Sequence, residues 1–162
     1  LAGCTPSAPK PTHSPTASRT PMFASDEEAL KAATDAYAAY LKMSDTIFSE
    51  GGIDPERMST VAIGQTLRTD IAGFATAKKR GWKQIGMTQF DGVRLQSVTA
   101  HGVRVYACVD VSGVDVVNAD GKSIVSEQRP ARSAVVVALE APPADNRLLV
   151  ASNDPWGGNG VC

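Results

Sequence analysis

The stretch VRVYACVDVSGV, residues 103–114, has the clearest strand pattern in this 162-residue chain. From 103 to 111 the odd-numbered positions hold Val or Ala, and the even-numbered positions hold Arg, Tyr, Cys and Asp. Because successive side chains of a strand point to opposite faces, this alternation predicts a strand with one face in the core. After residue 111 the apolar positions become even-numbered, and Ser112-Gly113 lies at the change. This predicts a β-bulge that bends the strand.

Further strands are predicted on both sides of this one. Residues 93–97 alternate in the same way. Residues 133–140 (SAVVVALE) are apolar on both faces, which predicts a central, covered strand. A tight connection at 142–146 leads to a last strand at 147–151. The sequence therefore predicts an antiparallel sheet of about four strands.

The segment before the sheet predicts helices, and the first has the strongest signals. Ser25 and Glu28 form a capping box, in which each side chain satisfies a free amide at the start of the helix. Apolar residues then recur every three or four positions as far as Phe48, where Gly51-Gly52 end the pattern. One long amphipathic helix is expected here.

Two shorter helices are predicted next. Asp54-Pro55 is a helix start with Asp as the N-cap, and Gly64 is expected to close this helix. A third helix runs from about Thr66 to Gly81, and the basic triplet at 78–80 suits the negative end of its dipole. The triplet also suits a nucleic-acid patch, but no further basic cluster accompanies it and the net charge is −1. No nucleic-acid partner is expected.

Helices grouped before strands predict an α+β fold in one domain. The helix at 25–48, the bulge at Ser112-Gly113 and the paired strands through Ala151 resemble the NTF2-like (cystatin-like) superfamily, over residues 25–156. The resemblance implies a half-open cone, with three N-terminal helices packed on a curved antiparallel sheet, and a domain covering 25–162. Members often dimerise through the sheet, so a homodimer is a further expectation.

The N-terminal segment differs in composition from the rest. Residues 5–24 contain five prolines among Ser and Thr, which predicts an extended tether that buries no core. Before it, LAGC (residues 1–4) resembles the lipobox of bacterial lipoproteins, in which Leu1-Ala2-Gly3 end the signal peptide and Cys4 carries the lipid. The alternative is an ordinary Cys4 thiol in a disordered tail.

Together, the lipobox, the tether and the domain resemble secreted NTF2-like lipoproteins of high-GC Gram-positive bacteria and their phages. The resemblance implies that Cys4 carries a diacylglyceryl thioether and an amide-linked acyl chain such as palmitate. The domain order is then signal peptide at 1–3, lipid-anchored tether at 4–24 and folded domain at 25–162. No stretch approaches the roughly 18 apolar residues of a membrane span, so the protein is expected on the extracytoplasmic face of the cell membrane, held by lipid.

Cys108 and Cys162 are left once Cys4 is assigned to the lipid. An exported protein meets an oxidising compartment, where a disulfide between them would form and persist. Such a bond would also tie down the C-terminus. The alternative is two free thiols.

The strand at 103–111 carries the catalytic candidates. Asp110 near the hydroxyl of Tyr106 would serve as a general base if both faced a cavity. The apolar odd-numbered positions are better suited to the core, so Asp110 and Tyr106 are expected on the exposed face. Tyr37 and Tyr40 of the first helix are further residues of the cone.

Other motifs give no catalytic set. The two histidines are far apart in the sequence and predict no metal site, and no nucleotide or nucleophile motif is present, so no cofactor is expected. We therefore expect a non-catalytic module that binds another envelope protein. The alternative is a small-molecule-binding cone with weak isomerase-like or cyclase-like activity through Asp110 and Tyr106.

Overall fold

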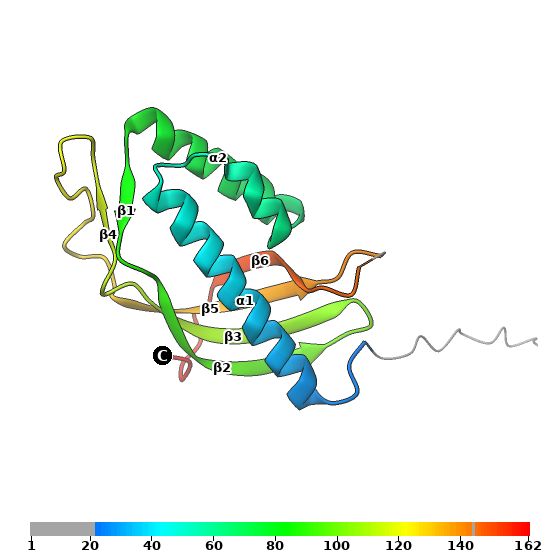
Figure 1. Cartoon of the computed structure of the whole chain (residues 1–162). Helices are drawn as coiled ribbons and strands as arrows, with labels where there is room; N and C mark the ends of the chain where they lie inside the picture. Colours follow the sequence, from blue (N-terminus) through cyan, green and yellow to red (C-terminus); the bar gives the residue numbers. More distant parts are fainter. Residues whose placement is uncertain (1–21, 144) are drawn as a thin grey trace, which may run out of the picture.

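A computed structural model describes residues 22–143 and 145–162 (Figure 1). The expectations for the signal peptide, for Cys4 and for the tether as far as residue 21 lie outside the described residues. The helical elements are α1 (Asp26–Ser49), the 3₁₀ helix η1 (Pro55–Thr60) and α2 (Gly64–Arg80). The strands are β1 (Lys83–Ile85), β2 (Gln89–Val98), β3 (Gly102–Asp110), β4 (Asp115–Val117), β5 (Arg132–Glu140) and β6 (Leu149–Pro155).

The strands form two antiparallel sheets. The larger has the order β2-β3-β5-β6, and the smaller pairs β1 with β4. Helices α1 and α2 both lie on one face of the larger sheet, while the C-terminal tail lies toward the other face (Figure 1). The prediction of an α+β fold, with helices packed against antiparallel sheet, is confirmed.

The start of α1 matches the predicted capping box. The Ser25 hydroxyl accepts a hydrogen bond from the amide of Glu28 at 3.2 Å, and the Glu28 carboxylate accepts one from the amide of Ala24 at 2.8 Å. The inward side of the helix then packs on the sheet. Its buried residues are Ala29, Ala33, Tyr37, Tyr40, Leu41, Asp45 and Ile47. Both the capping residues and the continuous apolar stripe therefore favour a helix over these residues.

The second predicted helix is a six-residue 3₁₀ helix rather than an α-helix, and Asp54 does not cap it through its side chain. Asp54 has φ +49°, a left-handed conformation that turns the chain, so its carboxylate does not face the helix start. The prediction that Gly64 closes this helix is wrong, because Gly64 is the first residue of α2. Gly81, at φ +67°, does end α2 as predicted.

The predicted bulge at Ser112-Gly113 is wrong. β3 ends at Asp110, the chain turns at residues 112–113, and β4 pairs with β1 in the other sheet. The apolar phase changes because the residues after the turn pack in a different environment, and Val114 is buried there. The larger sheet has its irregular register elsewhere, between Asp91 and Arg94 and between Leu95 and Ser97 on β2, and next to Ala138 on β5.

The core lies between α1, η1 and the larger sheet. Val103, Val105 and Ala107 of β3 are buried against the helices, as their odd-numbered pattern predicts. β5 lies between β3 and β6, as predicted for a central strand. The Tyr37 ring packs edge-on against Phe90, with 5.2 Å between ring centroids. Aromatic and aliphatic side chains thus fill the space between helix and sheet.

Candidate functional site

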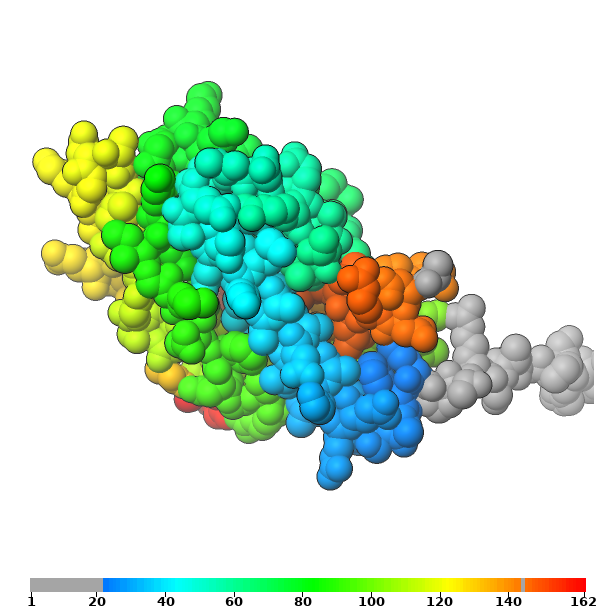
Figure 2. All heavy atoms as spheres, in the orientation of Figure 1, coloured from blue at the N-terminus to red at the C-terminus, as the bar shows by residue number. Residues whose placement is uncertain are grey.

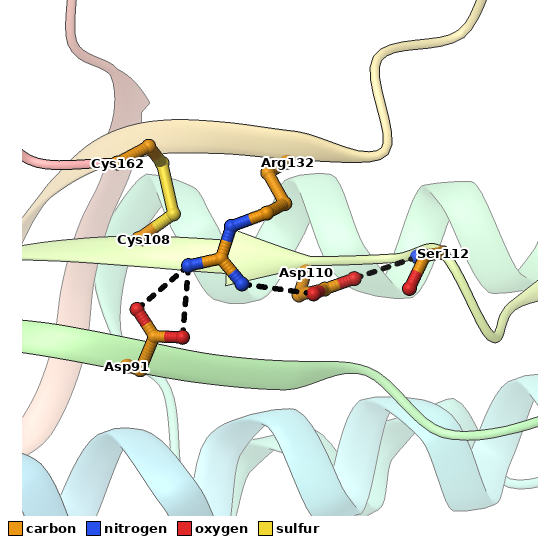
Figure 3. Close-up of a disulfide and its surroundings, with 6 residues drawn as sticks. All are labelled: Asp91, Cys108, Asp110, Ser112, Arg132 and Cys162. Carbon is orange, nitrogen blue, oxygen red and sulfur yellow. Dashed lines mark hydrogen bonds and ion pairs between the residues drawn. A yellow bond between two sulfur atoms is a disulfide. The ribbon is translucent and has the colours of Figure 1, made fainter.

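The structure places Asp110 on the face of the sheet opposite α1, as the strand pattern predicts (Figure 3). Tyr106, four residues earlier on the same strand, points to the same face. Asp110 accepts hydrogen bonds from the amide of Ser112 at 2.8 Å and from the Arg132 guanidinium at 2.9 Å. These bonds, those from Ser112 first, lower the pKa of Asp110. Asp110 is thus a paired carboxylate on this outer face, and its hydrogen-bond partners are Ser112 and Arg132 rather than Tyr106.

Tyr106 has its own partners on the same face. Its hydroxyl accepts a hydrogen bond from the Gln96 side chain at 2.8 Å, and its ring lies 4.9 Å from the ring of Trp156. Trp156 begins the C-terminal tail, and its amide donates to the Ala134 carbonyl at 2.8 Å. Tyr106 therefore helps to hold the tail on the sheet.

The predicted disulfide is present in the structure. Cys108 and Cys162 are bonded, with their Cα atoms 5.0 Å apart. Cys108 lies on β3 opposite Asp91 of β2, next to the Arg132 guanidinium, which contacts both Asp91 and Asp110 (Figure 3). The tail thus crosses this face of the sheet from β6 to a covalent attachment on β3. The tail is held on this face by the disulfide, together with the Trp156 contacts to the Tyr106 ring and to the Ala134 carbonyl.

A polar pocket of about 370 Å³ lies at the junction of α1, α2 and β6. Its wall consists of residues from all three elements: Tyr40, Gln65, Thr66, Thr69, Asp70, Ala151, Ser152, Asn153 and Asp154. The volume is within the range of small-molecule sites. Most of the wall is polar, which distinguishes it from the filled core beneath.

Two tyrosines of α1 bond to residues of this pocket: Tyr40 lines it, and Tyr37, in the core, reaches the lining residue Asn153. The Tyr37 hydroxyl donates to Asn153 Oδ1 at 3.2 Å, and the Tyr40 hydroxyl interacts with the side chains of both Asp70 and Asn153. Burial raises the pKa of both phenols well above the ordinary value, and the Asp70 charge adds to the rise for Tyr40. Both hydroxyls are therefore neutral and serve as hydrogen-bond donors at any physiological pH.

Asp70 is the unusual residue of the pocket. Its Oδ2 atom is inaccessible to solvent and has no hydrogen-bond partner. Burial raises the pKa of Asp70, and the interaction with Tyr40 opposes that rise only in part. Buried polar atoms without partners are rare in folded proteins and call for an explanation.

Asp45, on α1, shows how this fold treats a carboxylate whose role is structural. It accepts hydrogen bonds from the Gln84 side chain at 2.6 Å and from the amide and hydroxyl of Thr88, each at 2.8 Å. These bonds fasten the β1–β2 connection to α1 and satisfy both oxygens. Asp70 lacks such a set, so we regard it as the candidate functional residue.

The chain positions Asp70 through the contact of α2 with β6. Thr66, one turn before Asp70, donates its hydroxyl to the Ala151 carbonyl at 2.6 Å, which fixes this side of the helix against the strand. Residues four apart share a helix face, so Asp70 lies beside the same strand. Sequence reasoning did not select Asp70 or Asn153. The available signal was the polar pair Thr66 and Asp70 at that spacing, next to the apolar side of α2.

A second hollow, of about 330 Å³, lies along the N-terminal half of α1. Ala32, Ala36, Leu148 and Val61 contribute to its mainly apolar wall. Figure 2 shows the β5–β6 connection, in orange, beside this half of α1, in blue. Its polar lining residues are Thr60, Asn146 and Arg147. Among the described residues the unpartnered buried oxygen belongs to Asp70, so the α1–α2–β6 pocket is the better candidate.

Within residues 22–143 and 145–162, no group of His, Cys, Asp or Glu side chains is arranged to hold a metal ion. None of the helices in the same residues is long and apolar enough to cross a membrane.

Comparison with known proteins gives one informative result. No family model and no curated protein matches the chain. The intermembrane-space region of the chloroplast protein ARC6 is similar in structure, with a TM-score of 0.55 and 13% sequence identity. The match covers 78% of this chain and 97% of that one. At this identity the similarity shows a shared α+β fold and nothing about function.

Proposed function

We propose that this chain is a non-catalytic binding protein that takes a small polar ligand in the pocket between α1, α2 and β6. The observation that carries the proposal is the Asp70 carboxyl group, which lines a pocket of ligand size while one of its oxygens has no partner. Such groups are rare and call for an explanation, and a ligand bound in the pocket supplies one.

Binding is favoured over catalysis by what surrounds Asp70. The pocket wall contains no His or Cys, and the Tyr40 phenol stays protonated. General acid–base chemistry needs a second group matched to the first. The other carboxyl group of the wall, Asp154, is exposed, so the wall favours binding over catalysis. Binding of an envelope protein elsewhere on the surface stays a prediction.

The fold proposed for this binding domain is the NTF2-like half-open cone. Two features support it: α1 lies along the face of a four-stranded antiparallel sheet, and register shifts occur on strands β2 and β5–β6. Such shifts bend strands and allow a sheet to curve around a helix.

The proposed location is the extracytoplasmic face of the cell membrane, where a lipid on Cys4 anchors the tether. The Cys108–Cys162 disulfide supports this, because disulfides persist in exported proteins and are rare in the cytosol. Two or three acyl chains bind membrane far more firmly than one.

Nuclear magnetic resonance tests the binding proposal. A library of small polar metabolites is screened against the ¹⁵N-labelled domain, residues 22–162. We expect at least one compound to shift the backbone amide signals of Thr69, Asp70 and Asn153 while those of Asp91 and Arg132, on the opposite face, stay unchanged. A library in which no compound moves the pocket signals would refute the proposal.

Fractionation tests the anchor. In the full precursor, Cys4→Ala is expected to move the protein from the membrane fraction to the soluble or secreted fraction, because the acceptor of the lipid is lost. Ser7→Ala, in the same segment, is the matched control and is expected to leave it in the membrane fraction. Continued tight attachment of the Cys4→Ala protein would disprove the anchor.

A further inference from the structure

We propose that the ligand of the α1–α2–β6 pocket is a small hydroxylated primary amine, bound as its ammonium ion against Asp70. This inference rests on the proposed function and specifies its ligand class. It follows from the charge of the wall, from the state of Asp70 and from the remaining polar groups.

The pocket wall is acidic. It contains two carboxyl groups, Asp70 and Asp154, and no Lys, Arg or His. Arg68, two residues before Asp70 on α2, points its guanidinium to Gln65 Oε1 at 2.8 Å. A carboxylate or phosphate ligand would meet the negative charge of these two carboxyl groups, so the wall favours a cation over an anion.

Asp70 lacks the donors that an ionised carboxylate needs. Its environment supplies the Tyr40 hydroxyl and leaves Oδ2 without a partner. Because Oδ2 is inaccessible to solvent, a ligand would meet the accessible part of Asp70 that lines the pocket and compensate the charge that both oxygens share. A primary ammonium ion brings three N–H donors and a positive charge, and charge-assisted hydrogen bonds are about twice as strong as neutral ones. A neutral hydroxyl would bring one donor and no charge. The ammonium ion is therefore the group that best compensates this carboxylate.

The rest of the wall accounts for the hydroxyl groups of the ligand. Thr69, Ser152 and Asn153 provide short side chains that both donate and accept hydrogen bonds. These groups come from α2 and β6, on two sides of the pocket. A compact body with several hydroxyls or amides would contact both sides at once.

The test compares amines with neutral compounds of the same shape. Glucosamine is paired with glucose, and ethanolamine with ethylene glycol, each titrated into the ¹⁵N-labelled domain at pH 6. We expect each amine to bind at least tenfold more tightly than its neutral partner, with shifts at Asp70 and Asn153. Asp70→Asn is expected to abolish that difference. Asp35→Asn, which removes the same charge from the exposed side of α1, is the matched control and should keep it.

The Asp70→Asn variant is expected to fold. Burial raises the pKa of Asp70, so between the ordinary value of 3.8 and its folded value the folded state binds more protons than the unfolded state. The ionised group therefore destabilises the fold above that window, and its removal should raise Tm at pH 7. The gain should disappear below pH 3.8, where both states are protonated. Tyr40 and Asp154 are the other ionisable groups of the wall, and neither contributes a cation.

The outcomes separate this inference from the proposed function. Equal binding of glucose and glucosamine at the pocket, unaffected by Asp70→Asn, would overturn the ammonium ligand and leave a polar-ligand site. If none of the four probes shifts the pocket signals, the hydroxylated-amine class is overturned. The proposed function then falls only if the wider metabolite library also fails.

Discussion

Loss of the Cys108–Cys162 disulfide is expected to lower the free energy of unfolding by about 4 kcal/mol. The bond joins residues 54 apart, and closing a loop of that length removes much of the freedom of the unfolded chain. In the folded state it holds the tail against the outer face of the sheet, where the Trp156 ring packs on Tyr106. Without the bond, the tail would keep non-covalent contacts alone, such as that ring contact and the Trp156 amide bond to β5.

Thermal unfolding measures this effect. The Cys108→Ala/Cys162→Ala protein is expected to melt roughly 8–16 °C below the wild type, since each kcal/mol is worth about 2–4 °C at this chain length. The reduced wild type serves as the control. It lacks the same crosslink but keeps both cysteine residues, so its Tm should fall by a similar amount. A double variant that melts within 2 °C of the oxidised wild type would contradict the prediction.

Replacement of Tyr37 by Ala is expected to destabilise the fold by about 3–5 kcal/mol, the range for a large aromatic residue in a core. Tyr37 is 1% exposed, and its ring contacts Phe90 on β2 and Tyr40 one turn away on α1. Removing the ring leaves a cavity where helix and sheet meet. The same change removes the hydroxyl that donates to Asn153 Oδ1, in the wall of the α1–α2–β6 pocket.

The Tyr37→Phe variant separates packing from hydrogen bonding. It keeps the ring and loses only the bond to Asn153, so it is expected to cost about 1 kcal/mol. Urea unfolding of the three proteins gives both numbers from the transition midpoints. If the Ala and Phe variants were equally destabilised, the hydrogen bond rather than the ring would support this part of the core.

Sequence patterns predicted correctly those elements whose conformation depends on residues close together in the chain. The capping box at Ser25 fixed the start of α1, and alternation at 103–111 placed Val105 inside and Asp110 outside. Both signals depend on neighbouring residues alone, and the structure agrees with both. Local patterns also predicted a side-chain helix cap at Asp54 and a β-bulge at Ser112-Gly113, and the structure shows neither. Asp54 adopts a left-handed conformation, and after Ser112-Gly113 the chain passes to the other sheet, where β4 pairs with β1.

The candidate site, too, depends on contacts between segments that are far apart in the sequence. Tyr40, Asp70 and Asn153 come from α1, α2 and β6, and each has an ordinary sequence neighbourhood. Their meeting depends on how α2 packs on β6, through contacts such as the Thr66 hydroxyl bond to Ala151. Periodicity predicts which face of an element is apolar, but it does not predict which polar residues at the margins of two faces come together.

The amino-acid sequence by itself determined the α+β class, the first helix and the inner and outer faces of β3. Each of these follows from short-range stereochemistry. The pairing of Cys108 with Cys162 was predicted only once Cys4 was assigned to a lipid, and the structure contains that disulfide. Tertiary structure alone decided the division into two sheets, the 3₁₀ form of η1 and the isolation of Asp70 Oδ2 from any donor. The physical reason is that burial and hydrogen-bond satisfaction depend on every element packed around a group, and no local pattern contains that information.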